Sequence, residues 1–201
     1  MREVSILAYG AGNIKSVQRA FERISIKTNI VSNASEIERA EHLVLPGVGA
    51  FKHCKNLIDK KGLKSALSRH LSGPKPFLGI CVGMQLMFSE SEEFGTNRGF
   101  NVISGQVKKI VTFSPNKVPV VGWKVVEPTS TRDFFDGLNS FYFVHSFHGV
   151  PKNCSEQAGV YRLNNQKITA AVARDNKIGV QFHPEKSGES GLLFLKKFTE
   201  L

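Results

Sequence analysis

The first half of the chain alternates short apolar runs with segments whose apolar residues recur every three or four positions. The runs at 4–9, 29–31, 42–45 and 76–78 predict buried strands. Helical spacing is carried by two sets of apolar side chains: Ile14, Val17, Phe21 and Ile24, then Leu63, Ala66, Leu67 and Leu71. This alternation predicts a parallel sheet with helices on both faces.

Polar residues at the ends of these segments predict how the helices begin. Asn13 precedes the first helical pattern and is a suitable N-cap. The run SEIE at 35–38 resembles a capping box. Both signals support helices between the first three strands.

The second half of the chain has a different pattern, with closely spaced strand-like runs and few helical segments. Strands are predicted at 106–111, 120–127, 141–148, 168–174 and 177–182, and a closing helix at 192–198. Turn residues separate the strands at 114–116, 136–137 and 164–165. We therefore expect an α/β fold with a central, mostly parallel sheet flanked by helices and an antiparallel or mixed extension in the second half. No linker or repeat divides the chain, so residues 1–201 are expected to form one domain.

Composition is ordinary for a soluble globular protein, with 41% hydrophobic and 22% charged residues. No run approaches the roughly 18 apolar residues of a membrane span, and no N-terminal signal pattern is present, so we expect a cytoplasmic protein. The three cysteines form no CxxC pair, which argues against a disulfide scaffold and a zinc site. We expect no metal and no cofactor.

The net charge of +10 raises the question of nucleic-acid binding. The basic residues are scattered along the chain and form no dense stripe on any predicted helix. This favours a lysine-rich solvent-exposed surface without a nucleic-acid or membrane partner. Docking to an acidic protein face is a further interpretation.

A glycine pair after the first strand, GAG at 10–12, invites a dinucleotide-binding interpretation. That fingerprint needs a third glycine, and Lys15 occupies its position. We interpret the glycines as a tight turn that brings Asn13 near the site.

The most informative motif is GICVG at 79–83, which lies between an apolar strand and a helix-forming run at 84–88. Glycines two residues either side of Cys81 suit a nucleophile elbow, because they relieve crowding at a sharp turn. A thiol at a helix N-terminus is favoured as thiolate. Cys81 is therefore the candidate nucleophile, and Cys54 and Cys154 lack such surroundings.

A potential base follows about a hundred residues later in the sequence HPE at 183–185. In an extended segment, His183 and Glu185 point to the same side, so the carboxylate can orient the imidazole. Together with Cys81 they form a candidate Cys-His-Glu triad. His145 and His148 lie on an aromatic strand and are candidates for lining the cleft.

The turn PGVG at 46–49 ends the third predicted strand. A glycine-flanked turn can present a backbone N–H to a developing oxyanion, and the Val82 N–H can supply a second donor. Each such donor typically lowers the barrier by ~3 kcal/mol. The backbone amides of Val48 and Val82 are therefore the candidate oxyanion hole.

These segments together resemble the class I, triad-type glutamine amidotransferases, whose fold is flavodoxin-like. Within that family they are most similar to the glutaminase subunits of imidazole glycerol phosphate synthases. The resemblance is carried by YGAGN at 9–13, PGVGAF at 46–51, GICVGMQ at 79–85, GW at 122–123, YFVHS at 142–146 and QFHPEKSG at 181–188.

The resemblance implies a glutaminase that releases ammonia from L-glutamine. It further implies a heterodimer with a cyclase of (β/α)8-barrel type, which uses the ammonia to make imidazole glycerol phosphate and aminoimidazole carboxamide ribotide in histidine biosynthesis. By the same analogy, Gly49, Gln85 and Glu93 bind glutamine. The face that meets the barrel is expected to include Asn13, Trp123 and Lys186. The Val48 amide is expected to be misdirected until that partner binds.

One segment departs from the family pattern. Members commonly carry histidine and asparagine around the Gly-Trp pair, where this chain has Val120 and Lys124. This leaves open a paralogous glutaminase that supplies ammonia to a diverged barrel for amidation of a surface-sugar precursor. A non-catalytic module on the same fold fits less well, because all three triad residues are present. Another cysteine hydrolase with an elbow also fits less well, because such enzymes lack the motifs PGVGAF at 46–51 and HPEKSG at 183–188.

Overall fold

The computed structural model describes residues 3–112, 117–129, 133–135, 137–138 and 140–201. Its first half alternates strands and helices as the sequence pattern predicts. The elements are β1 (Glu3–Leu7), α1 (Ile14–Arg23), β2 (Lys27–Val31), α2 (Ala34–Arg39), β3 (His42–Gly47), α3 (Phe51–Lys60), α4 (Lys64–Ser72), β4 (Phe77–Cys81) and α5 (Val82–Gln85).

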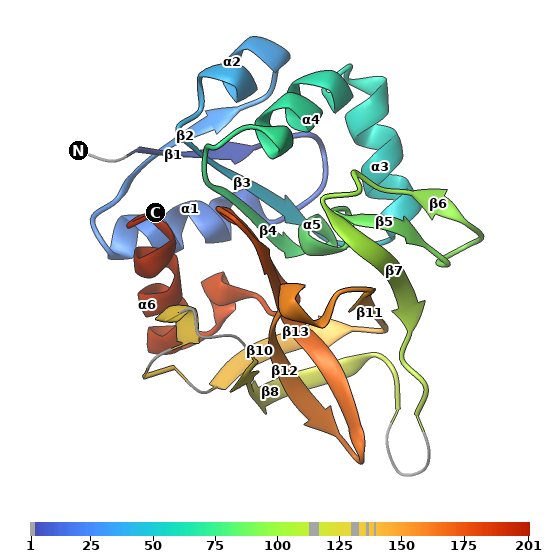
Figure 1. Ribbon diagram of the computed structural model, residues 1–201. Coiled ribbons are helices and arrows are strands. Elements are labelled where there is room, and N and C mark those ends of the chain that lie inside the picture. Colours follow the sequence, from blue (N-terminus) through green and yellow to red (C-terminus); the bar gives the residue numbers. More distant parts are fainter. Residues whose placement is uncertain (1–2, 113–116, 130–132, 136, 139) are drawn as a thin grey trace.

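The main sheet has eight strands in the order β2-β1-β3-β4-β14-β13-β12-β9, where the last four are β14 (Lys177–Val180), β13 (Gln166–Arg174), β12 (Gln157–Leu163) and β9 (Glu127–Pro128). The five strands from β2 to β14 are parallel, and the remaining pairings are antiparallel. Helices α1 and α6 (Gly188–Phe198) pack together on one side, whereas α2, α3 and α4 lie on the other (Figure 1). The mostly parallel α/β fold with an antiparallel extension is therefore confirmed.

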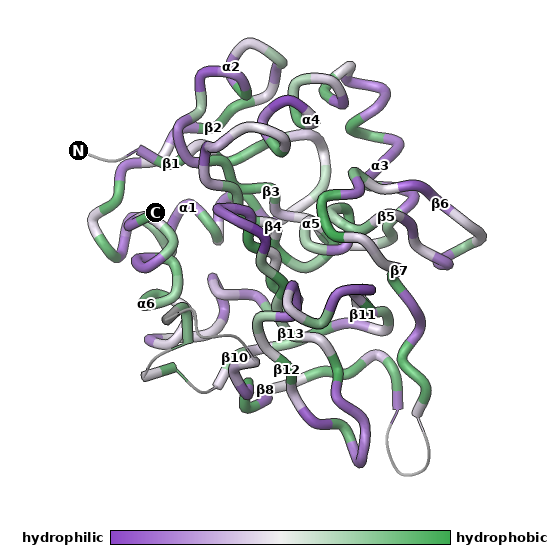
Figure 2. The backbone as a smooth tube through the Cα atoms, in the orientation of Figure 1, coloured by the Kyte–Doolittle hydropathy of each residue, from purple (hydrophilic) through white to green (hydrophobic). Residues whose placement is uncertain are grey.

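Burial explains why the central strands read as continuous apolar runs. Strands β3 and β4 are buried at every position, as expected for parallel strands covered on both faces. In Figure 2, hydrophobic (green) stretches of the backbone lie at the centre of the molecule, and more hydrophilic (purple) stretches lie along the surrounding helices. The carboxyl ends of β3, β4 and β14 meet at one edge of the sheet, where sites of such folds form.

The second half adds strands and one long helix. They are β5 (Phe88–Ser91), β6 (Asn97–Arg98), β7 (Ile103–Lys109), β8 (Val120–Val125), β9 (Glu127–Pro128), β10 (Ser140–His145), β11 (Phe147–Pro151), β12 (Gln157–Leu163), β13 (Gln166–Arg174), β14 (Lys177–Val180) and α6. Besides joining the main sheet, they form a two-stranded β10-β8 sheet and a four-stranded β11-β7-β5-β6 sheet. The short 3-10 helices are η1 (Asp133–Phe135), η2 (Cys154–Glu156) and η3 (Pro184–Lys186).

Several local predictions need correction. The helix after the elbow ends at Gln85, because the chain turns at once into β5. One predicted strand at 141–148 is two strands, β10 and β11, which belong to different sheets. The helix α3 and the strands β5, β6 and β12 were not predicted. The predicted turn at 114–116 and one residue of the turn at 136–137 lie outside the described residues.

The first two helices begin with the predicted capping interactions, but the capping box of α2 starts two residues earlier than predicted. The Asn13 side chain accepts a hydrogen bond from Ser16 N at 3.3 Å, as predicted for an N-cap. The capping box begins at Asn33 rather than Ser35: its side chain accepts from Glu36 N at 3.1 Å, and Glu36 accepts from Asn33 N.

A cluster of phenylalanines lies between β10, the end of β14 and α6. The rings of Phe141 and Phe182 stack at 4.0 Å, and Phe194 packs edge-on against Phe182 at 5.5 Å. Each of these three side chains is fully buried. Because Phe182 directly precedes His183, this cluster supports one wall of the site.

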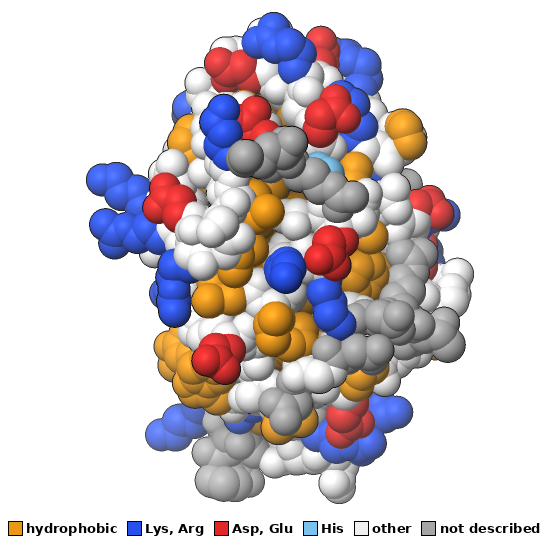
Figure 3. Space-filling view, turned by 90° about the vertical axis from the view of Figure 1, so that its left-hand side faces the viewer, with side chains coloured by type: hydrophobic (Ala, Val, Ile, Leu, Met, Phe, Trp, Pro, Cys, Tyr) orange, Lys and Arg blue, Asp and Glu red, His pale blue; other side chains and the backbone are white. Residues whose placement is uncertain are grey.

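Basic and acidic side chains are interspersed on one face of the molecule (Figure 3). On the face shown in Figure 3, Lys and Arg side chains are separated by acidic and hydrophobic ones. Each helix among the described residues is too short or too polar to cross a membrane.

The phenylalanine cluster generates a stability prediction. Replacing Phe141 with Ala should lower the free energy of unfolding by about 3–5 kcal/mol, because a fully buried ring leaves a cavity among three aromatic neighbours. Phe94→Ala is the matched control, since Phe94 is 77% exposed and its loss should cost under about 0.5 kcal/mol. Urea denaturation measures both. Equal costs for the two variants would contradict the assigned core.

Candidate active site

Cys81 stands at the junction between β4 and α5, in a strained backbone conformation. Its φ of 55° lies in the left-handed region, which is unfavourable for a residue with a side chain. Gly79 and Gly83 permit this turn by close packing: a Cβ at Gly79 would lie 2.6 Å from the Gly83 carbonyl carbon, and one at Gly83 would lie 1.9 Å from Leu45 O. The predicted elbow is therefore present.

The helix that follows Cys81 is a single turn, so its contribution to the site is local. Val82 is its first residue, where backbone N–H groups have no partner within the helix. These N–H groups, rather than the dipole of a long helix, are the polar groups that the elbow contributes beside the sulfur.

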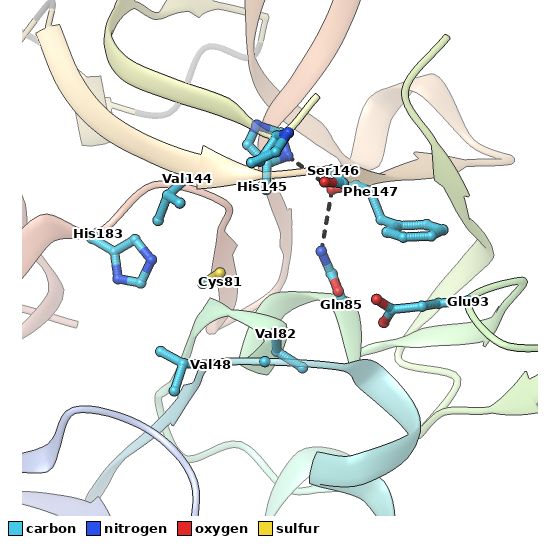
Figure 4. A pocket seen from close by; sticks show the side chains of 12 residues that line it. Val48, Cys81, Val82, Gln85, Glu93, Val144, His145, Ser146, Phe147 and His183 are labelled. Carbon is cyan, nitrogen blue, oxygen red and sulfur yellow. Dashed lines mark hydrogen bonds between the residues drawn. The ribbon is translucent and has the colours of Figure 1, made fainter. Parts of the chain in front are cut away.

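His183 lies between β14, the strand that pairs with β4, and η3, and Glu185 is within η3. The imidazole Nδ1 donates to Glu185 Oε1 at 2.8 Å, and both side chains are almost fully buried. The other ring nitrogen, Nε2, makes no hydrogen bond of standard geometry within the described residues, and the ring lies beside Cys81 in the pocket (Figure 4). The structure thus brings together all three predicted triad residues.

The backbone of His183 is fixed from two directions. His183 N donates to Tyr142 O at 2.9 Å, which ties the segment to β10. The Ser187 hydroxyl donates to His183 O at 2.6 Å and accepts from Tyr142 N at 3.0 Å. Ser187 therefore joins the His183 segment to the two-stranded sheet.

The charge state of His183 depends on its two partners. Burial lowers the pKa of His183, but its interactions with Cys81 and Glu185 outweigh burial and raise that pKa to about 10. An imidazolium is therefore favoured while Cys81 is a thiolate. The protonated ring is a proton donor beside the Cys81 sulfur at neutral pH.

A cavity of about 330 Å³ opens above these side chains (Figure 4). This is near the lower end of small-molecule pockets and suits a ligand of amino-acid size. It is lined by Val48, Gly49, Cys81, Val82, Gln85, Glu93, Pro119, Val144, His145, Ser146, Phe147 and His183. All three residues expected to bind glutamine and both oxyanion-hole residues are in this lining, whereas His148 is not.

The end of β3 packs directly against the elbow. A Cβ at Gly47, its last residue, would lie 2.8 Å from Gly83 N and 2.9 Å from Val82 Cβ, so this strand end and α5 are in close contact. Gly49 has a φ of 90°, which favours glycine. The Val48 carbonyl accepts a hydrogen bond from the buried Cys54 thiol at 3.4 Å. Cys54 thus restrains the peptide that follows Val48.

Two polar side chains reach the pocket from α5 and from the loop after β5. Glu93 Oε2 accepts from Phe51 N at 2.7 Å, at the start of α3. Gln85 is buried, and its Nε2 donates to Phe147 O at 3.2 Å and to Gln181 Oε1 at 3.1 Å. Figure 4 shows the Gln85 nitrogen directed at this carbonyl, with Glu93 on the same side of the pocket.

The residues expected at the partner face are all exposed. Asn13 and Lys186 are exposed, and Trp123 on β8 is 54% exposed. The Trp123 ring lies close to Gly188, because a Cβ at that position would be only 3.9 Å from the ring. Val120, which replaces the common histidine, is buried and pairs with His145 across the β10-β8 sheet. Lys124 is half-buried on the same strand.

Gln181 and Cys54 were not among the predicted site residues, although Gln181 Nε2 lies 3.6 Å from Cys81 Sγ. A signal existed for Gln181, because it is a polar residue inside the apolar run 178–182. For Cys54, the helical spacing of Phe51, Cys54 and Ile58 would have indicated the helix that carries it. Among the described residues, no group of three or more His, Cys, Asp and Glu side chains is arranged to hold a metal ion.

Comparison with solved structures bears on the fold. A structure titled PurLQS from Thermotoga maritima superposes with a TM-score of 0.73 at 16% identity, covering 99% of this chain and 98% of that one. A putative GMP synthase protein from Thermoplasma acidophilum gives 0.71 at 19% identity, covering 100% and 93%. A structure titled glutamine amidotransferase gives 0.72 at 20% identity, covering 98% and 99%. The fold is that of class I glutamine amidotransferases.

Comparison of sequences bears on the family. Residues 5–200 match the family described as glutamine amidotransferase class-I. The imidazole glycerol phosphate synthase subunit HisH of Syntrophotalea carbinolica is 39% identical, with 98% of this chain and 100% of the relative covered. The protein of that name from Prochlorococcus marinus is 38% identical, with 100% and 98% covered. The chain therefore belongs to the class I glutamine amidotransferases and, within them, to the family of imidazole glycerol phosphate synthase subunit HisH, the glutamine-dependent enzymes of histidine biosynthesis.

Proposed function

We propose that this chain hydrolyses L-glutamine by Cys81-His183-Glu185 catalysis and passes the ammonia to a (β/α)8-barrel cyclase subunit. The observation that carries the proposal is the shared position of a strained cysteine and a carboxylate-bound imidazole in one pocket. Glu185 fixes Nδ1 as a donor, which leaves Nε2 available for proton transfer at Cys81.

The reaction proceeds in two halves. The Cys81 thiolate attacks the carboxamide carbon of glutamine, and the His183 imidazolium gives its proton to the departing nitrogen, which leaves as ammonia. The glutamyl thioester is then attacked by water, whose proton returns to His183. Glutamate leaves and the thiolate is restored, so that protons and charges balance over the cycle.

The negative charge that develops on the carbonyl oxygen needs donors. Val82 N–H at the start of α5 and Val48 N–H on the loop packed over it are the donors we assign to it. We further propose that Val48 N–H is misdirected until the cyclase binds. The Cys54 contact to the Val48 carbonyl holds the Val48–Gly49 peptide, which is next to the peptide that carries this N–H, so it supports a single resting arrangement of the loop.

The polar side of the pocket suits the amino-acid end of glutamine. We assign the α-ammonium to Glu93, whose Oε1 stays available while Oε2 accepts from Phe51 N. Gln85 and the backbone at Gly49 are assigned to the remaining polar groups of glutamine. These residues orient the substrate so that its carboxamide lies over Cys81.

An exposed apolar surface next to the pocket supports the partner assignment. Val121, Trp123 and Val125 on β8 are each more than half exposed. Val121 pairs with Val144, which also lines the pocket, so the surface and the pocket are contiguous. We propose that this surface, with Asn13 and Lys186, docks on the cyclase and that ammonia leaves beside it. The surface-sugar alternative is not favoured, because full-length relatives are HisH subunits.

We also propose that residues 1–201 form one glutamine amidotransferase domain that acts in the cytoplasm. The family match over residues 5–200 supports a single domain. The three cysteines are free thiols, which fits a reducing compartment.

Cys81→Ala should reduce glutamate release from glutamine by more than about a thousandfold, because no other group in the pocket can form the thioester. Synthesis by the complex with free ammonium should survive. Cys154→Ala is the matched control and should keep full glutaminase activity, since Cys154 is exposed outside the pocket. Undiminished glutamate release by the Cys81 variant would disprove the nucleophile assignment.

Glu185→Gln should lower the pKa of His183 from about 10 toward the ordinary ~6.5, because one of its two negative partners is lost. In the wild type, the stabilisation linked to this raised pKa is complete below about pH 6.5 and is lost as the pH rises through about 10. NMR titration of the histidine rings measures the pKa, with Glu189→Gln on α6 as the control. An unchanged His183 titration in Glu185→Gln would refute this electrostatic role.

Trp123→Asp should weaken association with the cyclase subunit by at least about tenfold, because it puts a charge at the centre of the apolar surface. Leu193→Asp on α6 is the control, because Leu193 is similarly exposed at 50% but lies on another element. Titration calorimetry with the purified cyclase measures both. If the two variants bound the cyclase with equal affinity, the exposed surface of β8 would not be part of the interface.

A further inference from the structure

One side chain touches the reacting sulfur but has no part in the steps above. Gln181 follows β14, is fully buried, and directs its Nε2 at Cys81 Sγ over 3.6 Å. Its Oε1 accepts from Gln85 Nε2 at 3.1 Å. The amide therefore bridges the nucleophile and a residue of the glutamine pocket.

The direction of this bridge follows from a backbone carbonyl. Phe147 O can only accept hydrogen bonds, so the Gln85 group that faces it at 3.2 Å must be the NH2 group. The second hydrogen of that NH2 is directed at Gln181, which must then present its oxygen. The remaining end of the Gln181 amide, which faces Cys81, is consequently its NH2 group.

The carbonyl at the head of this chain is held in place by a neutral histidine. His145 Nδ1 donates to the same Phe147 O at 2.8 Å, and its Nε2 accepts from the Tyr161 hydroxyl at 2.9 Å. Burial lowers the pKa of His145 to about 4, so the ring is neutral at pH 7 and keeps this arrangement. The orientation of both glutamine amides is thus imposed by groups on β11, β10 and β12.

We propose that Gln181 stabilises the Cys81 thiolate by donating a hydrogen bond to its sulfur, and that Gln85 and Phe147 O keep the Gln181 amide in the donating orientation. The inference deepens the proposed function and rests on Cys81 being the nucleophile. A hydrogen bond that is stronger to the charged than to the neutral form of a group favours the charged form.

Other titratable groups also face Cys81 and bear on its charge. His183 lies beside the sulfur from the segment after β14, and its interactions with Cys81 and Glu185 keep the ring positively charged. Tyr9 from the loop after β1 and Cys54 from α3 interact with Cys81 electrostatically, and burial raises the pKa of both, so they stay neutral at pH 7. Gln181 therefore acts beside one cation, while Tyr9 and Cys54 are neutral and Glu93 is the carboxylate in the lining of the same pocket.

The test is the pH dependence of Cys81 alkylation by iodoacetamide in the full-length chain, followed by mass spectrometry that resolves Cys81 from Cys54 and Cys154. Gln181→Met keeps the length of the side chain but removes the donor, and should move the midpoint of alkylation up by about 1 pH unit. Gln181→Glu places a carboxylate beside the sulfur and should raise the alkylation midpoint further, because a second negative charge disfavours the thiolate. The control is Gln166→Met, because Gln166 donates to Val111 O away from the pocket.

Glutamine hydrolysis supplies a second readout that a structural role would not produce. In Gln181→Met, kcat/KM should fall severalfold near pH 6.5 and recover near pH 9, where the thiolate forms without the donor. A lower kcat/KM that is the same at every pH would overturn the proposal. So would alkylation midpoints that stay at the wild-type value in both Gln181 variants.

A third variant keeps the test decisive if substitution of Gln181 unfolds the chain. Gln85→Met leaves Gln181 in place but frees its amide to rotate, so the midpoint should still rise, and no rise would overturn the proposal. The two proposals fail separately. If the alkylation midpoint rises in the variants but the wild-type complex does not hydrolyse glutamine, only the glutaminase proposal is contradicted. If the wild-type complex hydrolyses glutamine normally but the midpoint rises in none of the variants, only the role of Gln181 is contradicted.

Discussion

The site depends on the close approach of α5 to the ends of β3 and β4. At Gly83 and Gly79 the backbones are too close for any side chain, and Cys81 between them is forced to a positive φ. The strain is maintained because the two neighbouring strands are fully buried and cannot move aside. As a result, the sulfur faces a cavity rather than the core.

The groups around the sulfur are held by hydrogen bonds to other elements, and this gives each a defined role. Glu185 sets the proton on His183, while Ser187 and Tyr142 fix the His183 backbone. The neutral amide of Gln181 also approaches the Cys81 sulfur. In the proposed mechanism one cation and one neutral donor would balance the charge on that sulfur, because a second buried charge would carry a large desolvation cost.

The second half of the chain supplies what the parallel sheet lacks. Strands β10 and β11 form the wall of the pocket opposite the elbow, and β8 carries the exposed apolar side chains beside it. A phenylalanine cluster fills the space behind this wall and ends at Phe182, directly before His183. The same strands thus hold His183, enclose the pocket and present the proposed docking surface.

Features governed by neighbouring residues could be predicted from the sequence. The glycines flanking Cys81, the Asn13 cap and the two-residue spacing of His183 and Glu185 all act over short distances. The elbow and a helix start were therefore predicted correctly, and the three candidate triad residues lie together in the structure. What only the tertiary structure decided depends on contacts between distant segments. The end of α5 at Gln85, the division of β10 from β11 and the amide bridge from Phe147 O through Gln85 and Gln181 to Cys81 join residues up to 100 positions apart. Local propensity carries no information on such pairs, because their geometry is set by the packing of one sheet against another.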